Sequence, residues 1–199
     1  MKDKTIFLYR EHLKEKDIDL SRYRFVRAYH ACRPDDLDSY LSDGLRPYSK
    51  EQAWNEVCKK LSRFFSEEKI IPVFEKKWAE HCKDGYDAFI HLSLEKKPLY
   101  DSIHPEMQHY LIYGSEFVYS VAIILMGSNW ALRDILQSGT PTIITCNVPI
   151  ERIPSAWYKL GFHYIDGLRA LPLSRDCIVK IEHPTGTVFD PILCCSEML

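Results

Sequence analysis

The chain has 199 residues and a formal net charge of −2, and 46% of its residues are hydrophobic. This composition is sufficient for a core and excludes global disorder, while the nearly neutral charge argues against unspecific nucleic-acid binding. The longest apolar run, residues 117–126, is shorter than the ~18–20 residues that span a bilayer. No secretory segment follows the N-terminus, and the seven cysteines lack metal-ligand spacing. We expect one cytoplasmic domain over residues 1–199, with reduced cysteines, no bound metal and no membrane partner.

The first half of the chain predicts one strand followed by helices. Residues 5–23 have no clear period and indicate a partly helical lead-in. Apolar side chains at helical spacing, with Gly44 and Gly85 as stop signals, define the helices. In chain order, the elements are a strand at 24–31, a short helix from Pro34 to Gly44, and amphipathic helices at 51–66 and 72–83. The last two helices predict an inserted helical lobe at about residues 50–84.

The second half of the chain predicts mainly strands. Ser115 is placed to cap a helix that is apolar on nearly all sides and is therefore expected to be buried. The predicted elements are a strand at 88–94, a loop at 95–108, helices at 115–126 and 128–139, and strands at 141–149, 163–165, 176–181 and 187–189. Because strands and helices do not alternate regularly, the fold class is α+β with a mixed or antiparallel sheet.

Several common catalytic motifs are absent from the sequence. Neither Gly-x-Gly-x-x-Gly nor Gly-x-x-x-x-Gly-Lys-[Ser/Thr] occurs, and Gly114-Ser115-Glu116 does not form a Gly-x-Ser-x-Gly elbow. These absences argue against kinases, dinucleotide-fold dehydrogenases and α/β-hydrolases.

The most informative stretch begins with Tyr29-His30-Ala31 and continues through a short helix to Gly44-Leu45-Arg46-Pro47. It resembles the first motif of the ADP-ribosyltransferase superfamily in the wide sense, which includes PARP-like enzymes, DarT-like toxins and RNA 2′-phosphotransferases. Cys32 stands where that motif has Thr or Ser. The resemblance implies an ADP-ribosyltransferase-like fold, NAD as substrate, and a protein or nucleic-acid acceptor. It also implies a toxin, effector or defence enzyme, with an antitoxin or larger complex as a possible partner.

The resemblance assigns roles to several side chains. His30 is expected to hydrogen-bond the nicotinamide ribose, and Ser93 matches a position near the end of the second family strand. Planar guanidinium groups pair well with a pyrophosphate, and Arg27 and Arg33 flank His30. Because side chains alternate along a strand, at most one of these arginines is expected on the same face as His30.

Cleavage of the nicotinamide–ribose bond develops positive charge on the ribose, which a nearby carboxylate stabilises. The catalytic glutamate of the family has no clean match here, and Glu116, Glu151 and Glu182 compete for the role. Glu116 is the only one that follows a Gly-Ser turn before a buried helix. We therefore expect His30, Tyr113 and Glu116 to converge in one cleft. The NAD-binding residues expected around them are Tyr29, His30, Arg27, Arg33, Ser93, Tyr113 and Ser115.

Two alternatives keep the fold and change the function. An RNA 2′-phosphotransferase-like enzyme would need several basic side chains around a phosphate, and Arg24, Arg27 and Arg33 lie near His30. A non-catalytic module that senses a nucleotide or a partner would explain Cys32 and the unmatched catalytic glutamate.

Overall fold

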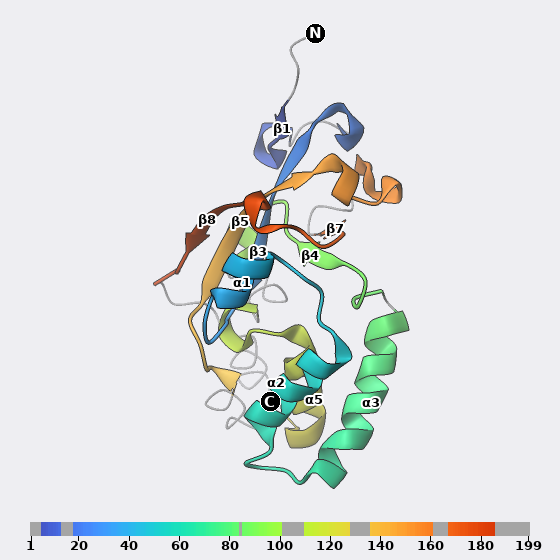
Figure 1. Ribbon diagram of the computed structural model, residues 1–199, viewed down its shortest axis with the longest axis vertical. Coiled ribbons are helices and arrows are strands. Elements are labelled where there is room, and N and C mark those ends of the chain that lie inside the picture. The colour runs from blue at the N-terminus through green and yellow to red at the C-terminus, as the bar shows by residue number, and fades with distance from the viewer. Residues whose placement is uncertain are drawn as a thin grey trace, which may run out of the picture.

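The computed structural model describes residues 5–12, 18–83, 85–100, 110–127, 136–160 and 167–185. The described chain is mixed α+β, as the sequence predicts. Figure 1 shows the strands gathered in one part of the molecule and the longer helices in the other. Separate hydrophobic cores lie within the two parts, and a smaller cluster around Ala31, Leu111 and Ile143 completes the interior.

The main sheet has the order β1-β3-β5-β8. Its strands are β1 (Ile6–Phe7), β3 (Phe25–Cys32), β5 (Thr142–Pro149) and β8 (Ile178–Glu182). Strand β3 pairs antiparallel with β5 along its whole length, from Phe25 opposite Pro149 to Cys32 opposite Thr142. The strands predicted at 24–31 and 141–149 are therefore neighbours in one sheet.

The opposite edge of β3 is paired only in part. Strand β1 runs parallel to it and covers only Phe25 and Val26. Farther along, Tyr29 and Ser93 exchange two backbone hydrogen bonds of 2.8 Å. Ser93 follows β4 (Ile90–Leu92), which forms a separate antiparallel pair with β7 (Leu168–Ala170). The two sheets therefore meet at Tyr29 and diverge beyond it.

The remaining described elements are short. Strand β2 (Ile18–Asp19) pairs antiparallel with β6 (Lys159–Leu160). Turns of 3₁₀ helix occur at Tyr9–Glu11, Leu20–Arg22, Lys97–Leu99, Ile150–Arg152, Ser155–Trp157 and Arg175–Cys177.

Three helices form the second core, and a shorter one lies near the sheet. The helices are α1 (Asp38–Asp43), α2 (Lys50–Leu61), α3 (Glu67–Lys83) and α5 (Glu116–Met126). Helix α2 begins with a complete capping box between Ser49 and Gln52, and Ser115 caps α5 as predicted. Helix α5 packs against both α2 and α3, so the helical part contains more than the insertion at 50–84.

Some sequence predictions differ from the structure. The segment at 5–23, expected to be partly helical, contains two 3₁₀ turns and also two short strands, because β1 and β2 are fixed by pairing with distant segments. Helix α3 starts at Glu67, five residues before the predicted start, and contains Pro72 in its second turn. Phe64 is 51% exposed and Leu41 41% exposed, although both occupy apolar positions of the helices predicted at 51–66 and 34–44. The strands predicted at 163–165 and 187–189, and residues 128–135 of the helix predicted at 128–139, lie outside the described residues.

No helix in the described ranges is long and apolar enough to cross a membrane. The five cysteines in those ranges, Cys32, Cys58, Cys82, Cys146 and Cys177, are all free thiols.

Gly44, which ends α1, provides a test of the fold. Its φ is +79°, and an added Cβ would lie 2.1 Å from the carbonyl oxygen of Leu173. Gly127 has a similar φ of +66° but open space around the position of a Cβ. Gly44→Ala should therefore lower the free energy of unfolding by roughly 1–3 kcal/mol more than Gly127→Ala, because only the former adds a clash. Chemical denaturation would measure the difference, and equal losses would contradict the close approach.

Candidate functional site

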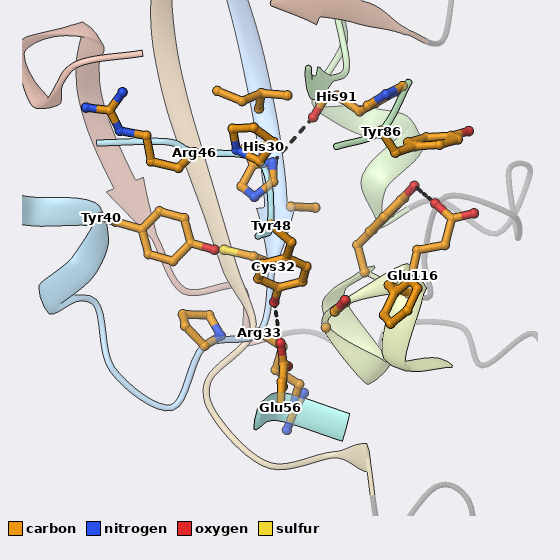
Figure 2. Close-up of a pocket in the computed structure, with 18 of the residues that line it drawn as sticks. His30, Cys32, Arg33, Tyr40, Arg46, Tyr48, Glu56, Tyr86, His91 and Glu116 are labelled. Atoms are coloured by element: carbon orange, nitrogen blue, oxygen red, sulfur yellow. Dashed lines mark hydrogen bonds between the residues drawn. The ribbon is translucent and has the colours of Figure 1, made fainter. Parts of the chain in front are cut away.

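A cavity of about 700 Å³ lies between the sheets and the helices. Its walls come from the second half of β3, the β4 strand, the chain from α1 to α2, one face of α3 and the start of α5. Such a volume is typical of small-molecule sites. Figure 2 shows labelled side chains from β3, β4, the chain between α1 and α2, and the start of α5 around one space.

His30 lies on the sheet wall of this cavity. Its Nδ1 is 3.4 Å from the backbone oxygen of His91, which favours the tautomer that carries the proton on Nδ1. Burial lowers the pKa of His30, and the contact with the His91 carbonyl opposes that shift. A neutral His30 would present Nε2 as a hydrogen-bond acceptor, suited to a ligand hydroxyl.

Cys32 follows His30 on the same face of β3. Burial raises the pKa of its thiol to about 12, and the side chain of Tyr40 hydrogen-bonds it. The ring centroid of Tyr40 is also 6.1 Å from that of His30. A thiol held protonated in this way is a poor nucleophile, so Cys32 contributes to the lining of the cavity and not to its chemistry.

The backbone of Ala31 provides polar groups at the point where the sheets diverge. Tyr29 directs its N–H and C=O toward Ser93, so the two-residue period of a strand directs those of Ala31 to the same edge. No strand within the described ranges pairs with that edge beyond Tyr29. Ala31 lines the cavity and can therefore offer one donor and one acceptor to a ligand.

Glu116 lines the cavity from the first turn of α5. The Tyr110 hydroxyl donates a hydrogen bond of 2.5 Å to Glu116 Oε2, and burial raises the pKa of Tyr110. The Glu116 side chain is exposed, so it is accessible from the cavity. Ser115 accepts a hydrogen bond from the Val118 amide and caps the helix that carries Glu116.

A second carboxylate, that of Glu56, lines another part of the same cavity. The Tyr48 hydroxyl donates to Glu56 Oε2, and Figure 2 shows this bond on a different wall from Glu116. Glu56 Oε1 lies 3.9 Å from Lys60 Nζ, whose hydrogen bond goes to the Leu136 carbonyl. Burial lowers the pKa of Lys60, which is only 5% exposed, and nearby Glu56 opposes that shift.

Stacked rings form a third wall. The rings of Tyr86 and His91 are 4.2 Å apart and those of Tyr86 and His81 are 5.3 Å apart, both nearly parallel. The Arg169 guanidinium lies 5.7 Å from the Tyr86 ring centroid. Burial, and then the charge of Arg169, lower the pKa of His91 to about 4. The buried Nε2 of His91 has no hydrogen-bond partner within the described part of the chain.

The structure brings six of the predicted site residues to the cavity and leaves two outside. His30, Glu116, Tyr29, Arg33, Ser93 and Ser115 all line it. The expectation for Tyr113 is wrong, because its ring is fully buried in the helical core and stacks on Tyr119 at 4.9 Å. Arg27 also lies elsewhere, with its Nε 2.7 Å from Asn147 Oδ1 on the neighbouring strand. Of the two flanking arginines, only Arg33 lines the cavity. Both lie three residues from His30, so strand alternation places neither on its face, and Arg33 follows the last residue of β3.

Two of the residues that do line the cavity use their polar groups internally. The Arg33 guanidinium donates to the carbonyls of Leu111, Gln137 and Ser138 at 3.0–3.1 Å. The Ser93 hydroxyl donates to the Glu95 carbonyl at 2.5 Å. Both side chains therefore stabilise the wall. Arg46 is an exposed guanidinium that also lines the cavity, from the segment after α1.

The competing glutamates lie away from the cavity. Glu151 is exposed in the 3₁₀ turn after β5. Glu182, at the end of β8, forms ion pairs with Lys96 and Lys180 at 2.8 and 3.0 Å. Neither residue lines the cavity.

Sequence reasoning missed Tyr48, Glu56, Lys60, Tyr86 and His91. One signal was present, because Lys60 lies three and seven residues after Val57 and Ala53, on the buried stripe of α2. A lysine in such a stripe indicates a specific partner. Tyr86 lies in a turn and His91 in the three-residue strand β4, and neither has a comparable pattern.

No family model, curated protein or solved structure matches this chain. The chemistry of the site therefore has to be inferred from its own geometry.

His91 should make the stability of the fold depend on pH. Its pKa is about 4 in the folded chain against 6.5 for an ordinary histidine, so the unfolded chain binds more protons between these values. The free energy of unfolding should therefore fall as pH drops from 6.5 toward 4. The loss from His91 is at most about 3 kcal/mol, because solvent screening reduces it.

The matched variants are His91→Phe, which keeps a ring against Tyr86, and His183→Phe at an exposed histidine. Denaturant melts at several pH values should show a shallower pH dependence for His91→Phe than for the wild type or His183→Phe. Parallel curves for all three proteins would exclude His91 as the source.

Proposed function

We propose that the protein is an NAD-dependent ADP-ribosyltransferase that transfers ADP-ribose to a macromolecular acceptor. The observation that carries this proposal is the presence of His30, the open Ala31 edge and Glu116 around one cavity of dinucleotide-compatible size. A toxin, effector or defence role is consistent with this activity, and the acceptor would be a protein or a nucleic acid.

Each of these groups suits one part of the NAD molecule. The N–H and C=O of Ala31 can pair with the carboxamide of nicotinamide as a neighbouring strand would. His30 Nε2 can accept a hydrogen bond from a ribose hydroxyl, and the aromatic side chains along the cavity provide faces for the bases. The exposed guanidinium of Arg46 is suited to the pyrophosphate.

The chemical step separates nicotinamide from the ribose. The C1′–N bond breaks, its electron pair leaves with the nicotinamide nitrogen, and positive charge develops on the ribose ring. A carboxylate at Glu116, oriented by Tyr110, would stabilise this charge more than it stabilises bound NAD. The acceptor then bonds to C1′.

The phosphotransferase alternative is less consistent with the arrangement of cations. Arg27 donates a hydrogen bond to Asn147 outside the cavity, and the Arg33 guanidinium donates hydrogen bonds to three backbone carbonyls. Neither is then available to hold a phosphate at an RNA end.

The decisive experiment is incubation with NAD and detection of free nicotinamide, with and without cell extract as a source of acceptors. Release by the wild-type protein is expected. A protein that binds NAD but releases no nicotinamide would instead be a sensing module, and activity on 2′-phosphorylated RNA would favour the phosphotransferase.

Glu116→Gln should lower nicotinamide release by about 10²- to 10³-fold and leave NAD binding nearly unchanged, because the carboxylate acts where charge develops. The matched controls are Glu151→Gln and Glu182→Gln, which alter carboxylates outside the cavity and should retain activity. Loss of activity in either control with full activity in Glu116→Gln would show that the assignment is wrong. His30→Ala should weaken both NAD binding and turnover, in contrast to Glu116→Gln.

A further inference from the structure

The cavity contains a second carboxylate that the proposed role of Glu116 does not use. Acidic side chains from Asp35, Asp36, Glu56, Glu80 and Glu116 line it. All are exposed except Glu56, whose side chain is 25% exposed. Partial burial of a carboxylate costs free energy unless neighbouring charges or hydrogen-bond donors compensate for the lost hydration. The groups around Glu56 therefore indicate its chemical role.

Within the described ranges, Glu56 accepts a hydrogen bond at one of its two carboxylate oxygens. The Tyr48 hydroxyl donates to Oε2 and fixes the orientation of the carboxylate. Oε1 lies 3.9 Å from Lys60 Nζ, within ion-pair range but too far for a hydrogen bond. Oε1 therefore has lone pairs that no hydrogen bond from Tyr48 or Lys60 occupies, and these can accept a proton.

The Tyr48 side chain, which donates to Glu56, also connects this carboxylate to the start of α5. The side chains of Tyr48 and Ser115 hydrogen-bond each other, and Ser115 directly precedes Glu116. Tyr48 with Glu56 and Tyr110 with Glu116 are thus two tyrosine–carboxylate pairs around one helix terminus. The two carboxylates differ in setting, since one is half-buried beside a lysine and the other is exposed.

Resting on the proposed ADP-ribosyl transfer, we propose that Glu56 is the general base that deprotonates the acceptor. The acceptor is then a neutral nucleophile with a proton to lose, such as a hydroxyl, an amine or water. As its heteroatom bonds to C1′, the C1′–N bond breaks and nicotinamide leaves with the electron pair. The proton of the acceptor passes to Glu56 Oε1, so charge and atoms balance.

Because Glu56 acts as the base and Glu116 stabilises the ribosyl charge, sodium azide should rescue only the loss of Glu56. Azide is an anionic nucleophile without a proton, so it needs no base but still needs stabilisation of the ribosyl charge. Glu56→Gln should lower nicotinamide release in water by about 10²-fold or more and leave NAD affinity within a few-fold of the wild type. Azide should restore release and yield azido-ADP-ribose. Glu116→Gln should stay inactive with azide, because its defect lies in charge stabilisation.

The controls use the chain's other carboxylates. Glu80→Gln changes an exposed cavity acid that pairs with Lys77 at 2.7 Å, and it should behave as the wild type. Glutamine at position 56 can still accept from Tyr48, but Lys60 loses its ionic partner. Glu56→Asp keeps the carboxylate beside Lys60 but shortens the side chain by one methylene. This variant replaces Glu56→Gln in the test if the Gln variant does not fold. The Asp variant should lose about 10-fold in release and regain it with azide.

Three results would overturn the inference. Full release by Glu56→Gln in water removes the need for a base at this position. A loss that azide does not repair, in a folded variant that binds NAD, assigns Glu56 to structure or charge stabilisation. Absence of release by the wild-type protein overturns the proposed function together with this inference, whereas the first two outcomes leave the proposed function intact.

Discussion

The pairing of strand β3 is unequal on its two edges, and the cavity exists because of that inequality. One edge is bonded to β5 from Phe25 to Cys32, which fixes the strand rigidly. The other edge is covered by β1 and then by Ser93, and beyond Tyr29 no described strand continues the ladder. Buried backbone groups require partners, so a strand that ends its pairing inside a protein is a natural place for a ligand with amide character.

The helical part supplies what the sheet lacks. Strands place His30 and Cys32 on one wall with fixed spacing, but none of the described residues of β3 and β4 that line the cavity is a carboxylate. Helices α2 and α5 bring Glu56 and Glu116 to the opposite side, each oriented by a tyrosine hydroxyl. A tyrosine donor fixes a carboxylate without neutralising it, which suits a site that must respond to positive charge.

Local sequence predicts several of the strands, helix ends and site residues, and the elements and residues that it does not predict depend on long-range contacts. Strand β3, strand β5, the Gly44 stop and the Ser115 cap all follow from side-chain type and short-range spacing. The two-residue strands β1 and β2 carry almost no local signal, because only pairing with distant segments makes them strands. Tyr113 was misassigned because a tyrosine beside a Gly-Ser turn can face either the core or the cavity. Glu56 and Tyr48 meet only through the turn between α1 and α2, which periodicity does not describe.

The stacked rings along the cavity end at a tryptophan, whose fluorescence depends on its surroundings. The Trp78 indole stacks on His81 at 5.1 Å, and His81 in turn stacks on Tyr86. The Arg169 guanidinium also lies 5.7 Å from the Tyr86 ring centroid and 5.3 Å from that of Trp157. Because His81 and Tyr86 themselves line the cavity, an occupant that shifts either ring changes the surroundings of an indole. The intrinsic fluorescence of the unmodified protein can therefore register occupancy without a label.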